Sequence, residues 1–384
     1  MAKLTTFVHD PTHIEPLIQA GIEHLILEDP QISIRSFSQT LPTDFKSLLT
    51  LADTARSLNP DIKLSINCDM LAHERHFPVL NQLISAIKPT PLRHIRVQDP
   101  GLLCFFQDQL ADVSCHLNLE TGNHTATGML SYAHYCDSQT VSNEVPYPDL
   151  QNIRKHCLFP LEIYVFGPLL IQYSVRRFLE GTAAVTPNDT HHRYIKYAQD
   201  TQFPGRYFKF YDNEHGHFMF AFFDRCLLKE IDKLKQLKMN YWLFDGRGES
   251  LDYLLTALNA FQNPSQFPIK DLQHNYPRPL KLGFFRANHT DQVHIAKPHM
   301  RKDHLTCVGT VVDLIKPNTI TIECHQNIQV GDTLTVVSPR YNDHTLTITV
   351  LQTLENESIS DSQDHIYVQI PWYKGARNGS QLYR

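Results

Sequence analysis

Short apolar segments alternate with amphipathic stretches through the first two thirds of the chain. Such runs are typical of buried strands, and their regular alternation with helical patterns is typical of repeated βα units. We predict strands at residues 4–8, 24–28, 63–67, 93–97, 113–119, around 138–142, 161–166 and 241–245. Eight parallel strands with intervening helices close into a barrel, so the pattern predicts an α/β fold of the TIM-like (β/α)8 type.

Amphipathic helices are predicted between these strands. One covers residues 45–58. Another covers residues 226–238, where Leu227, Leu228, Ile231, Leu234 and Leu237 fall on one stripe.

The pattern changes beyond about residue 262. Residues 263–279 are polar and rich in proline, which is typical of a linker. From 280 to 384, short β-rich runs alternate with Pro, Asn, Asp and Gly turns, which indicates an all-β segment. We therefore predict a barrel over residues 1–262, a linker over 263–279 and a small β-barrel C-terminal domain over 280–384.

Composition narrows the functional class. The 384 residues are 42% hydrophobic and 20% charged, with a net charge of -5 that argues against a generally basic, RNA-coating surface. The chain contains no apolar run near the roughly 18 residues of a membrane span, and its start lacks the apolar core of a signal peptide. We expect a cytoplasmic protein without membrane contact. Its eight cysteines include no CxxC pair and fit reduced thiols better than disulfides.

Polar residues follow nearly every predicted strand, at the rim where barrel enzymes carry their chemistry. Short polar side chains at these places also cap helices and fill turns, which is the commoner role of any single one. The positions are His9, Asp10, Glu28, Asp29, Asn67, Asp69, Asp99, Glu120, Asn123, Glu144, Gly167, Asp245 and Arg247.

The segment LEIYVFGPLLIQYSVRR, residues 161–177, resembles the signature of peptidase family U32, the collagenase-like proteases. Glu162, Gly167, Tyr173, Ser174 and Arg176 stand at matching positions, whereas Phe166 replaces the family His and Leu170 and Arg177 replace two Cys residues. Weaker matches in the same order are Asn67, Asp99-Pro100-Gly101, Glu144, Asp245-Gly246-Arg247, Ser250 and Tyr253. The resemblance also implies a TIM-like barrel, and residues 327–339 resemble the small β-barrel that ends many members.

The resemblance implies a [4Fe-4S] cluster held by four thiolates in the better understood members, which is the ordinary ligation of such a cluster. Here Cys226 alone falls where a family ligand is expected. One thiolate does not hold a cubane, so we predict that this chain has no cluster and no other metal.

Family relatives imply prephenate-dependent hydroxylation of a tRNA uridine at C5. We therefore expect an RNA modification protein, with prephenate as a co-substrate and a cluster-bearing paralogue as a partner. The predicted catalytic residues are Glu162, Tyr173, Arg176, Asp245 and Arg247, and the predicted substrate-binding residues are Asn67, Asp99, Glu120 and Glu144. Glu162, if it points into the barrel, needs a cation such as Arg176 or Arg247, and a purely structural ion pair is an equal alternative.

Basic and aromatic residues interleave between residues 191 and 218, a mixture that suits single-stranded RNA. The alternation of 206–212 also fits ordinary strand packing, with Tyr207 and Lys209 on one face. The predicted RNA contacts are Arg193, Lys196, Arg206, Lys209, Arg301 and Lys302.

Other functions stay open. Proteolysis is implied by the family name, but the sequence has no HExxH helix and no GxSxG elbow. A non-catalytic role in a ubiquinone-pathway hydroxylase, which the family also includes, is a further alternative. His215 and His217 with Asp212 make only a weak zinc candidate, because a third and fourth ligand are not evident.

Overall fold

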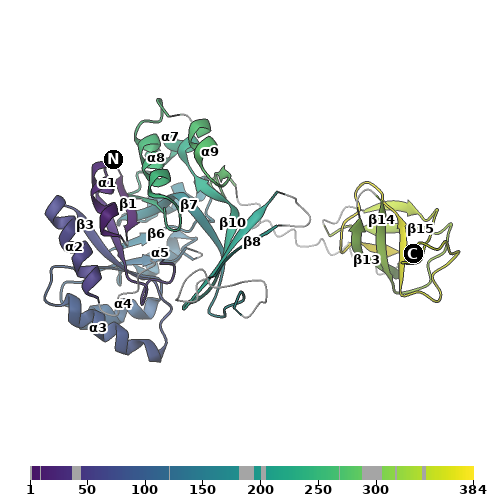
Figure 1. Cartoon of the computed structure of the whole chain (residues 1–384), viewed down its shortest axis with the longest axis horizontal. Helices are drawn as coiled ribbons and strands as arrows, with labels where there is room; N and C mark the ends of the chain where they lie inside the picture. The colour runs from purple at the N-terminus through teal and green to yellow at the C-terminus, as the bar shows by residue number, and fades with distance from the viewer. Residues whose placement is uncertain are drawn as a thin grey trace. The chain divides into compact units, whose positions relative to one another are not determined.

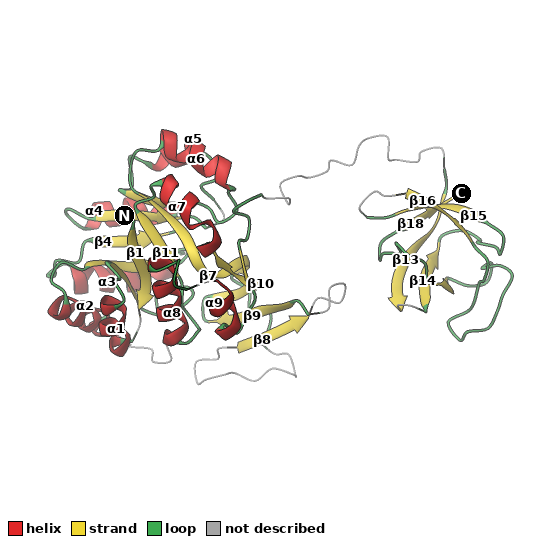
Figure 2. Ribbon diagram, turned by 90° about the horizontal axis from the view of Figure 1, so that it is seen from above, coloured by secondary structure: helices red, strands yellow, loops and turns green. Residues whose placement is uncertain are grey.

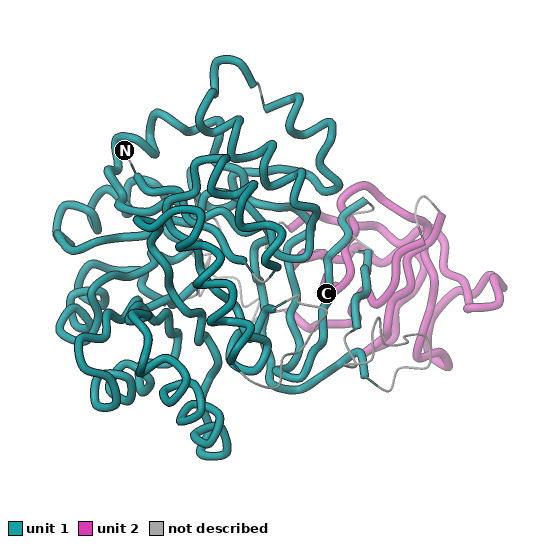
Figure 3. The backbone as a smooth tube through the Cα atoms, turned by 60° about the vertical axis from the view of Figure 1, so that its left-hand side comes forward, with its two compact units in different colours: residues 1–289 teal, residues 290–384 magenta. Residues whose placement is uncertain are grey.

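The structure is a computed structural model, and it describes residues 2–8, 10–36, 45–120, 122–180, 194–199, 205–267, 269–287, 305–315, 318–339 and 343–384. The chain forms two compact units, residues 1–289 and 290–384 (Figure 3). Each is described by itself.

The first unit is a closed parallel barrel, as predicted. Its strands pair side by side in chain order from β1 to β7, and β11 closes the circle by pairing with both β1 and β7. These strands are β1 (Lys3–Val8), β2 (His24–Glu28), β3 (Lys63–Cys68), β4 (His94–Val97), β5 (Ser114–Asn118), β6 (Ser138–Thr140), β7 (Leu161–Ser174) and β11 (Tyr241–Phe244). All eight predicted strands are confirmed.

Helices surround the barrel because each has an apolar face to bury against the strands (Figures 1 and 2). In α2 the buried face is Leu48, Leu51, Ala52 and Ala55. The helices are α1 (Ile14–Gln19), α2 (Lys46–Leu58), α3 (Phe77–Ile87), α4 (Pro100–Gln109), α5 (Ala126–Tyr132), α6 (Tyr147–His156), α7 (Ile231–Leu237) and α8 (Leu251–Gln262). Short 3-10 turns precede three of them, namely η1 (Pro11–His13), η2 (Glu74–His76) and η3 (Leu228–Glu230). The helix α7 is shorter than the predicted helix 226–238, because Cys226 ends a strand and residues 228–230 form the turn η3.

The second half of β7 and the three strands β8 (Tyr194–Gln199), β9 (Tyr207–Asn213) and β10 (Gly216–Cys226) form an antiparallel extension of the sheet, which we call the arm. In it, β7 pairs with β10, which pairs in turn with β9 and then β8. Among the described strands, β8 pairs with β9 alone and so ends the sheet (Figure 1). It confirms the prediction that residues 206–212 form a strand.

Gly167 is where β7 exchanges its barrel neighbour for the arm. Its φ is +126°, and a Cβ atom there would lie 2.2 Å from the Asp245 carbonyl oxygen. A side chain would push the end of β11 away, so only glycine fits. This close approach fixes Asp245 and the residues after it against the signature segment.

The predicted linker, 263–279, and the predicted start of the C-terminal domain at 280 both fall inside the first compact unit. Residues 263–279 contain the helix α9 (Ile269–Asn275), which packs beside α8, and β12 (Leu280–Lys281) then pairs with β10. Leu272 and Tyr276 are buried. Their helical spacing outweighs the prolines around them, so the boundary between the compact units falls after residue 289 instead.

The second unit is a curled antiparallel sheet, ordered β16-β15-β18-β13-β14-β17. The strands are β13 (Cys307–Ile315), β14 (Thr319–Cys324), β15 (Thr333–Val337), β16 (Asp343–Thr347), β17 (Tyr367–Pro371) and β18 (Gln381–Tyr383). Beyond β16 the chain bridges from Gln352 to Gln369 of β17, which brings the two ends of the sheet together. Val308, Ile320, Leu334 and Leu382 lie in its core.

Candidate functional site

A buried ion pair lies inside the barrel. Arg96 of β4 donates two hydrogen bonds to the Glu162 carboxylate of β7, from Nη1 to Oε2 at 3.0 Å and from Nη2 to Oε1 at 2.7 Å. Both side chains are fully buried. The Thr140 hydroxyl donates a further bond to Glu162 Oε1 at 2.9 Å. The cation that Glu162 needs is therefore Arg96, and the predicted partners Arg176 and Arg247 are wrong.

Two histidines complete this interior layer as neutral groups. His116 contacts the hydroxyls of Ser138 at 2.8 Å and Thr140 at 2.7 Å, and His24 contacts Ser65 at 2.6 Å. Burial, followed by the charge of Lys63 for His24 and of Arg96 for His116, lowers the pKa of both rings well below the usual range. Neutral imidazoles between hydroxyls fit a structural network.

A second cluster lies at the ends of the strands. It brings together Asp245 and Arg247, which were predicted to be catalytic, Asn67, which was predicted to bind substrate, and the strand-end residue Glu28. Arg247 donates to Asp245 through Nε at 2.9 Å and Nη2 at 2.7 Å, and through Nη1 to Glu28 at 3.0 Å. Asn67 Nδ2 donates to the same Glu28 oxygen at 3.3 Å. The guanidinium also lies 3.5 Å from the centre of the Phe7 ring. Each of the three guanidinium nitrogens of Arg247 thus donates a hydrogen bond to a carboxylate.

Glu28 is the carboxyl group in this cluster that ionises least readily. Burial raises its pKa to about 7, although the charge of Arg247 opposes the rise and Asp69 and Asp245 add to it. Burial also disfavours the charge on Asp245, but the hydrogen-bonded Arg247 outweighs it and lowers the pKa of Asp245. The cluster therefore holds one firmly ionised carboxylate and one that takes up a proton near neutral pH.

Arg35 lies at the same rim, and not all of its guanidinium nitrogens have a described hydrogen-bond partner. Its Nη2 donates to Glu120, and burial of the pair is nearly complete, at 4% and 10% side-chain exposure. Nε and Nη1 of Arg35, Oε2 of Glu28 and Oδ1 of Asn67 are buried without a partner among the described residues. Because unpaired buried polar groups are costly, such a set indicates a place where a ligand or water binds.

A cleft of about 580 Å³ opens next to this cluster. Glu120, Glu144 and Tyr173 line it, all three predicted, together with Leu170 and Ile171. A smaller apolar pocket of about 160 Å³ shares Glu120, Glu144, Leu170 and Ile171 and adds Phe208 and Phe222 from the arm. A cleft lined by both apolar and polar side chains, with an aromatic extension, is typical of small-molecule sites.

The remaining predicted residues lie elsewhere. Asp99 caps α4, since its carboxylate accepts from Gly101 N at 2.8 Å and from Ala72 N at 3.0 Å. Arg176 is exposed beyond the end of β7 and does not line the cleft.

The arm carries the described part of the predicted RNA surface. Lys196 is exposed, and Arg206 lies 4.9 Å from the centre of the Phe222 ring. Lys209 is buried with its Nζ 3.4 Å from Glu249, so it is not presented to solvent. Arg193, Arg301 and Lys302 lie outside the described residues.

The candidate metal ligands His215, His217 and Cys226 do not form a metal-binding cluster in the described structure. Of the zinc candidates, His217 hydrogen-bonds Asp212, whereas His215 contacts the Pro30 carbonyl oxygen at 2.6 Å instead of joining them. Cys226 is buried, and burial raises the pKa of its thiol to about 12. Across the described residues, no three His, Cys, Asp or Glu side chains are grouped so as to hold a metal ion.

Sequence reasoning missed Arg35 and Arg96. Arg96 leaves one signal, because a charged residue in the middle of the apolar strand 94–97 needs a buried partner. Arg35 follows β2 in a stretch without periodicity, so its sequence gives no comparable signal.

Comparisons with known proteins agree with the signature. The model of "Peptidase family U32" matches residues 9–280. A solved U32 peptidase, Mk0906, is 12% identical and covers 44% of this chain and 70% of its own, with a TM-score of 0.37. The C-terminal domain of a putative U32 peptidase from Geobacillus thermoleovorans is 11% identical and covers 21% of this chain and 99% of its own, with a TM-score of 0.20.

A GH18 chitinase from Cycas revoluta is 11% identical and covers 68% of this chain and 100% of its own, with a TM-score of 0.37. No curated protein matches the chain. In the described part of the chain, no helix has both the length and the apolar character needed to cross a membrane.

Proposed function

Because the chain belongs to peptidase family U32, we propose that it acts in RNA modification, as a cluster-free member or partner subunit in prephenate-dependent hydroxylation of a tRNA uridine at C5. The observation that carries this proposal is the arm, which carries cations and exposed aromatic rings and whose Phe208 and Phe222 line the apolar pocket beside the cleft. The cytoplasm, where tRNA is modified, is the proposed compartment.

The arm suits single-stranded RNA by its two faces. Tyr197 and Tyr207 are 51% and 52% exposed, and the β8–β9 register puts them on one face, diagonally across the two strands. Lys196 and Arg206 alternate onto the other face. There, Arg206 and Lys281 both approach the Phe222 ring that lines the apolar pocket, at 4.9 and 4.4 Å. A strand passing over β8 would find rings for bases and cations for phosphates.

The cleft beside the arm suits an unstacked base and a small acid. Its volume of about 580 Å³ falls within the usual range for small-molecule sites. We propose Arg35 as the anchor for a carboxylate of a prephenate-like donor, because two of its nitrogens lack partners among the described residues and its partner Glu120 and neighbour Ile34 line the cleft. Arg247 is already satisfied by two carboxylates, and Arg176 is exposed beyond the end of β7. In this proposal Arg35, and not the predicted catalytic residues Arg176 and Arg247, contacts the ligand.

The donor set does not fit a [4Fe-4S] cluster. Leu170 lines the cleft where the family has a thiolate, and among the described residues Cys226 is not grouped with other ligands that could hold a metal ion. Redox equivalents for hydroxylation therefore have to come from elsewhere, and we propose a cluster-bearing paralogue as that partner. Stoichiometric iron and sulfide in the purified chain would contradict this.

Proteolysis has less support from the side chains. Ser174 Oγ accepts from the Arg176 backbone N–H at 3.1 Å. His217 lies opposite Ser174 in the β7–β10 register, but it bonds to Asp212, and among the described contacts no hydrogen bond joins its ring to the Ser174 hydroxyl. The apolar pocket, with Leu169, Phe208, Phe222 and Phe223, favours one second candidate. It would accept the ring of a quinone precursor, so a non-catalytic role in a ubiquinone-pathway hydroxylase is our alternative.

Binding of an unmodified tRNA transcript tests the arm directly. Tyr197→Ala combined with Tyr207→Ala should weaken binding at least about tenfold, since each stacked base contributes about 1–3 kcal/mol. Fluorescence anisotropy of labelled tRNA measures the change. Tyr135→Ala is the matched control, because Tyr135 is 47% exposed but not part of the arm. Equal affinity in all three proteins would remove the arm from the RNA surface.

Nucleoside mass spectrometry of tRNA from a deletion strain tests the function itself. We expect a hydroxylated uridine to disappear and to return with the wild-type gene but not with the double tyrosine variant. Normal tRNA together with an accumulated quinone precursor would instead support the second candidate.

A further inference from the structure

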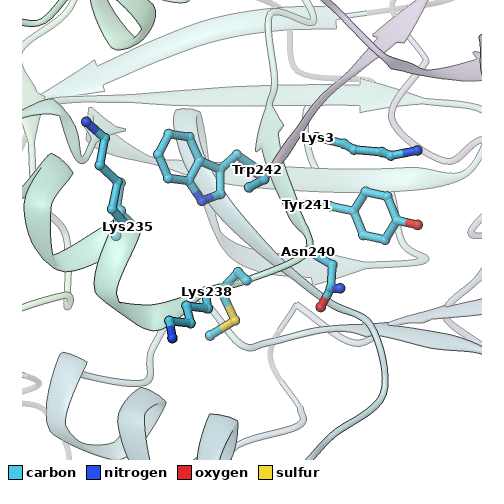
Figure 4. A pocket seen from close by; sticks show the side chains of 9 residues that line it. Lys3, Lys235, Lys238, Asn240, Tyr241 and Trp242 are labelled. Carbon is cyan, nitrogen blue, oxygen red and sulfur yellow. The ribbon is translucent and has the colours of Figure 1, made fainter.

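A separate pocket lies at the opposite end of the barrel, where β1 and β11 begin. Its volume is about 420 Å³, and its walls come from the start of β1, the end of α7 and the start of β11 (Figure 4). The described residues that line it are Ala2, Lys3, Leu234, Lys235, Lys238, Met239, Asn240, Tyr241 and Trp242. None of them belongs to the cleft described above, so its chemistry is independent of the proposed function.

The charge around this pocket has one sign. Lys3, Lys235 and Lys238 line it from different elements, and none of the described lining residues is acidic. All three lysines are exposed, and within the described residues none forms an ion pair. In a chain with a net charge of -5, three such cations around one hollow are a local excess of positive charge.

Trp242 provides an independent sign that a ligand binds here. Its side chain is buried, with only 4% of the residue exposed, and its Nε1–H has no partner in the described structure. Buried indole N–H groups usually find an acceptor. In the view of Figure 4 the ring nitrogen lies on the edge nearer Lys238, with Lys235 on one side of the indole and Lys3 on the other. A ligand oxygen in the pocket would accept this hydrogen bond.

Asn240 adds a second donor beside the indole. Its Oδ1 accepts from the Leu161 backbone N–H at 3.1 Å, which fixes the side chain and leaves the amide N–H groups for a ligand. Tyr241 is already engaged, because Lys63 donates to its hydroxyl at 2.9 Å. The pocket thus offers donors and cations on a wall that also carries Leu234, Met239 and the indole.

We propose that this pocket binds a small phosphorylated molecule with an apolar or aromatic portion. Lysines are compact charges that surround a phosphate from several directions, whereas a planar carboxylate is matched better by arginine, which is not among the described lining residues. The pocket exceeds the size of phosphate alone, and its apolar wall accounts for the rest of the ligand.

Titration calorimetry with four probes tests the proposal on the full chain. We expect AMP and ribose 5-phosphate to bind, inorganic phosphate to bind more weakly, and adenosine not to bind, with affinities that fall as salt is raised. Of the two larger probes, the tighter one identifies whether a nucleotide or a sugar phosphate is the better model. No binding of any phosphate probe at millimolar concentration, or adenosine binding as tightly as AMP, would overturn the proposal.

Two variants locate the binding in this pocket. Lys235→Gln with Lys238→Gln removes exposed charges and should weaken the best probe at least about tenfold. Trp242→Phe keeps the buried ring but removes the N–H donor, and should weaken it about tenfold. Lys229→Gln is the matched control, since Lys229 is exposed in η3, ahead of α7, and does not line the pocket. Undiminished binding in both test variants would place the ligand elsewhere and overturn the assignment.

Discussion

The barrel holds two layers of buried charge that differ in how completely they are satisfied. Inside, Glu162 receives both terminal nitrogens of Arg96 and the Thr140 hydroxyl. At the rim, Arg35 pairs with Glu120 through one nitrogen and leaves two others without a described partner. Glu28 likewise leaves one carboxylate oxygen unpaired.

This difference separates a structural group from a binding group. Arg96 keeps one nitrogen, Nε, without a described partner, but both oxygens of Glu162 are bonded and the pair does not line the cleft. The unpaired atoms of Arg35 instead belong to a side chain that pairs with Glu120, which lines the cleft, so a ligand there could satisfy them. The carboxylate of the signature residue Glu162 is therefore fully engaged inside the barrel, which favours a structural role over the predicted catalytic one. The ligand-binding capacity lies one layer higher, with Arg35, Glu120 and Glu28.

The largest expected effect comes from breaking the interior pair. Glu162→Leu leaves Arg96 buried without its counter-ion, which should lower the free energy of unfolding by about 3–5 kcal/mol. Urea denaturation followed by circular dichroism measures the loss. Arg96→Met combined with Glu162→Leu should recover most of it, because the double variant buries no charge.

The double variant is also the decisive control. If it is as unstable as Glu162→Leu alone, the damage comes from lost packing or from the hydroxyl network, and the assignment of the pair as a charge anchor fails.

The second effect is a pH dependence that belongs to the rim. The folded protein holds the Glu28 proton up to a pKa of about 7, whereas an unfolded glutamate loses it near its ordinary value of 4.5. The folded state therefore binds more protons in this window, and the contribution of Glu28 to stability falls as pH rises through it. The shift corresponds to roughly 3 kcal/mol between the two limits.

Glu28→Gln should remove this contribution. Urea titration at pH 4.5 and at pH 8 measures the unfolding free energy of both proteins. Between these two pH values, the wild type should lose more stability than the variant. Equal pH slopes in both proteins would mean that Glu28 is ionised throughout and that the rim is as well satisfied as the interior.

The sequence predicted the barrel well because buried parallel strands leave contiguous apolar runs. It failed at α9, where prolines around residues 263–279 resemble a linker and only the spacing of Leu272 and Tyr276 indicates a packed helix. Local composition and tertiary burial give opposite signals there, and burial prevails.

The site was predictable only in part. Strand-end polarity identified Asn67, Asp245 and Glu120 as rim residues, since that position follows from chain order alone. Their pairing depends on which residues of each strand point inward and how neighbouring strands are staggered, and this is set by barrel closure. Arg96 could therefore be recognised as needing a partner, but not matched to Glu162. The unpaired nitrogens of Arg35 have no counterpart in the sequence at all.

The smallest effect concerns a rim residue that belongs to neither layer. Asp99 was predicted to bind substrate, yet its two oxygens accept from the backbone N–H groups of Gly101 and Ala72. Asp99→Ala should lower the free energy of unfolding by about 1 kcal/mol, as loss of a helix cap does. Asp99→Asn keeps one acceptor and should cost less. Thr125→Ala, which removes the cap of α5, provides a matched comparison by thermal denaturation. If Asp99→Asn instead leaves stability intact and abolishes tRNA modification, Asp99 contacts substrate and the cleft extends further along the rim than its lining indicates.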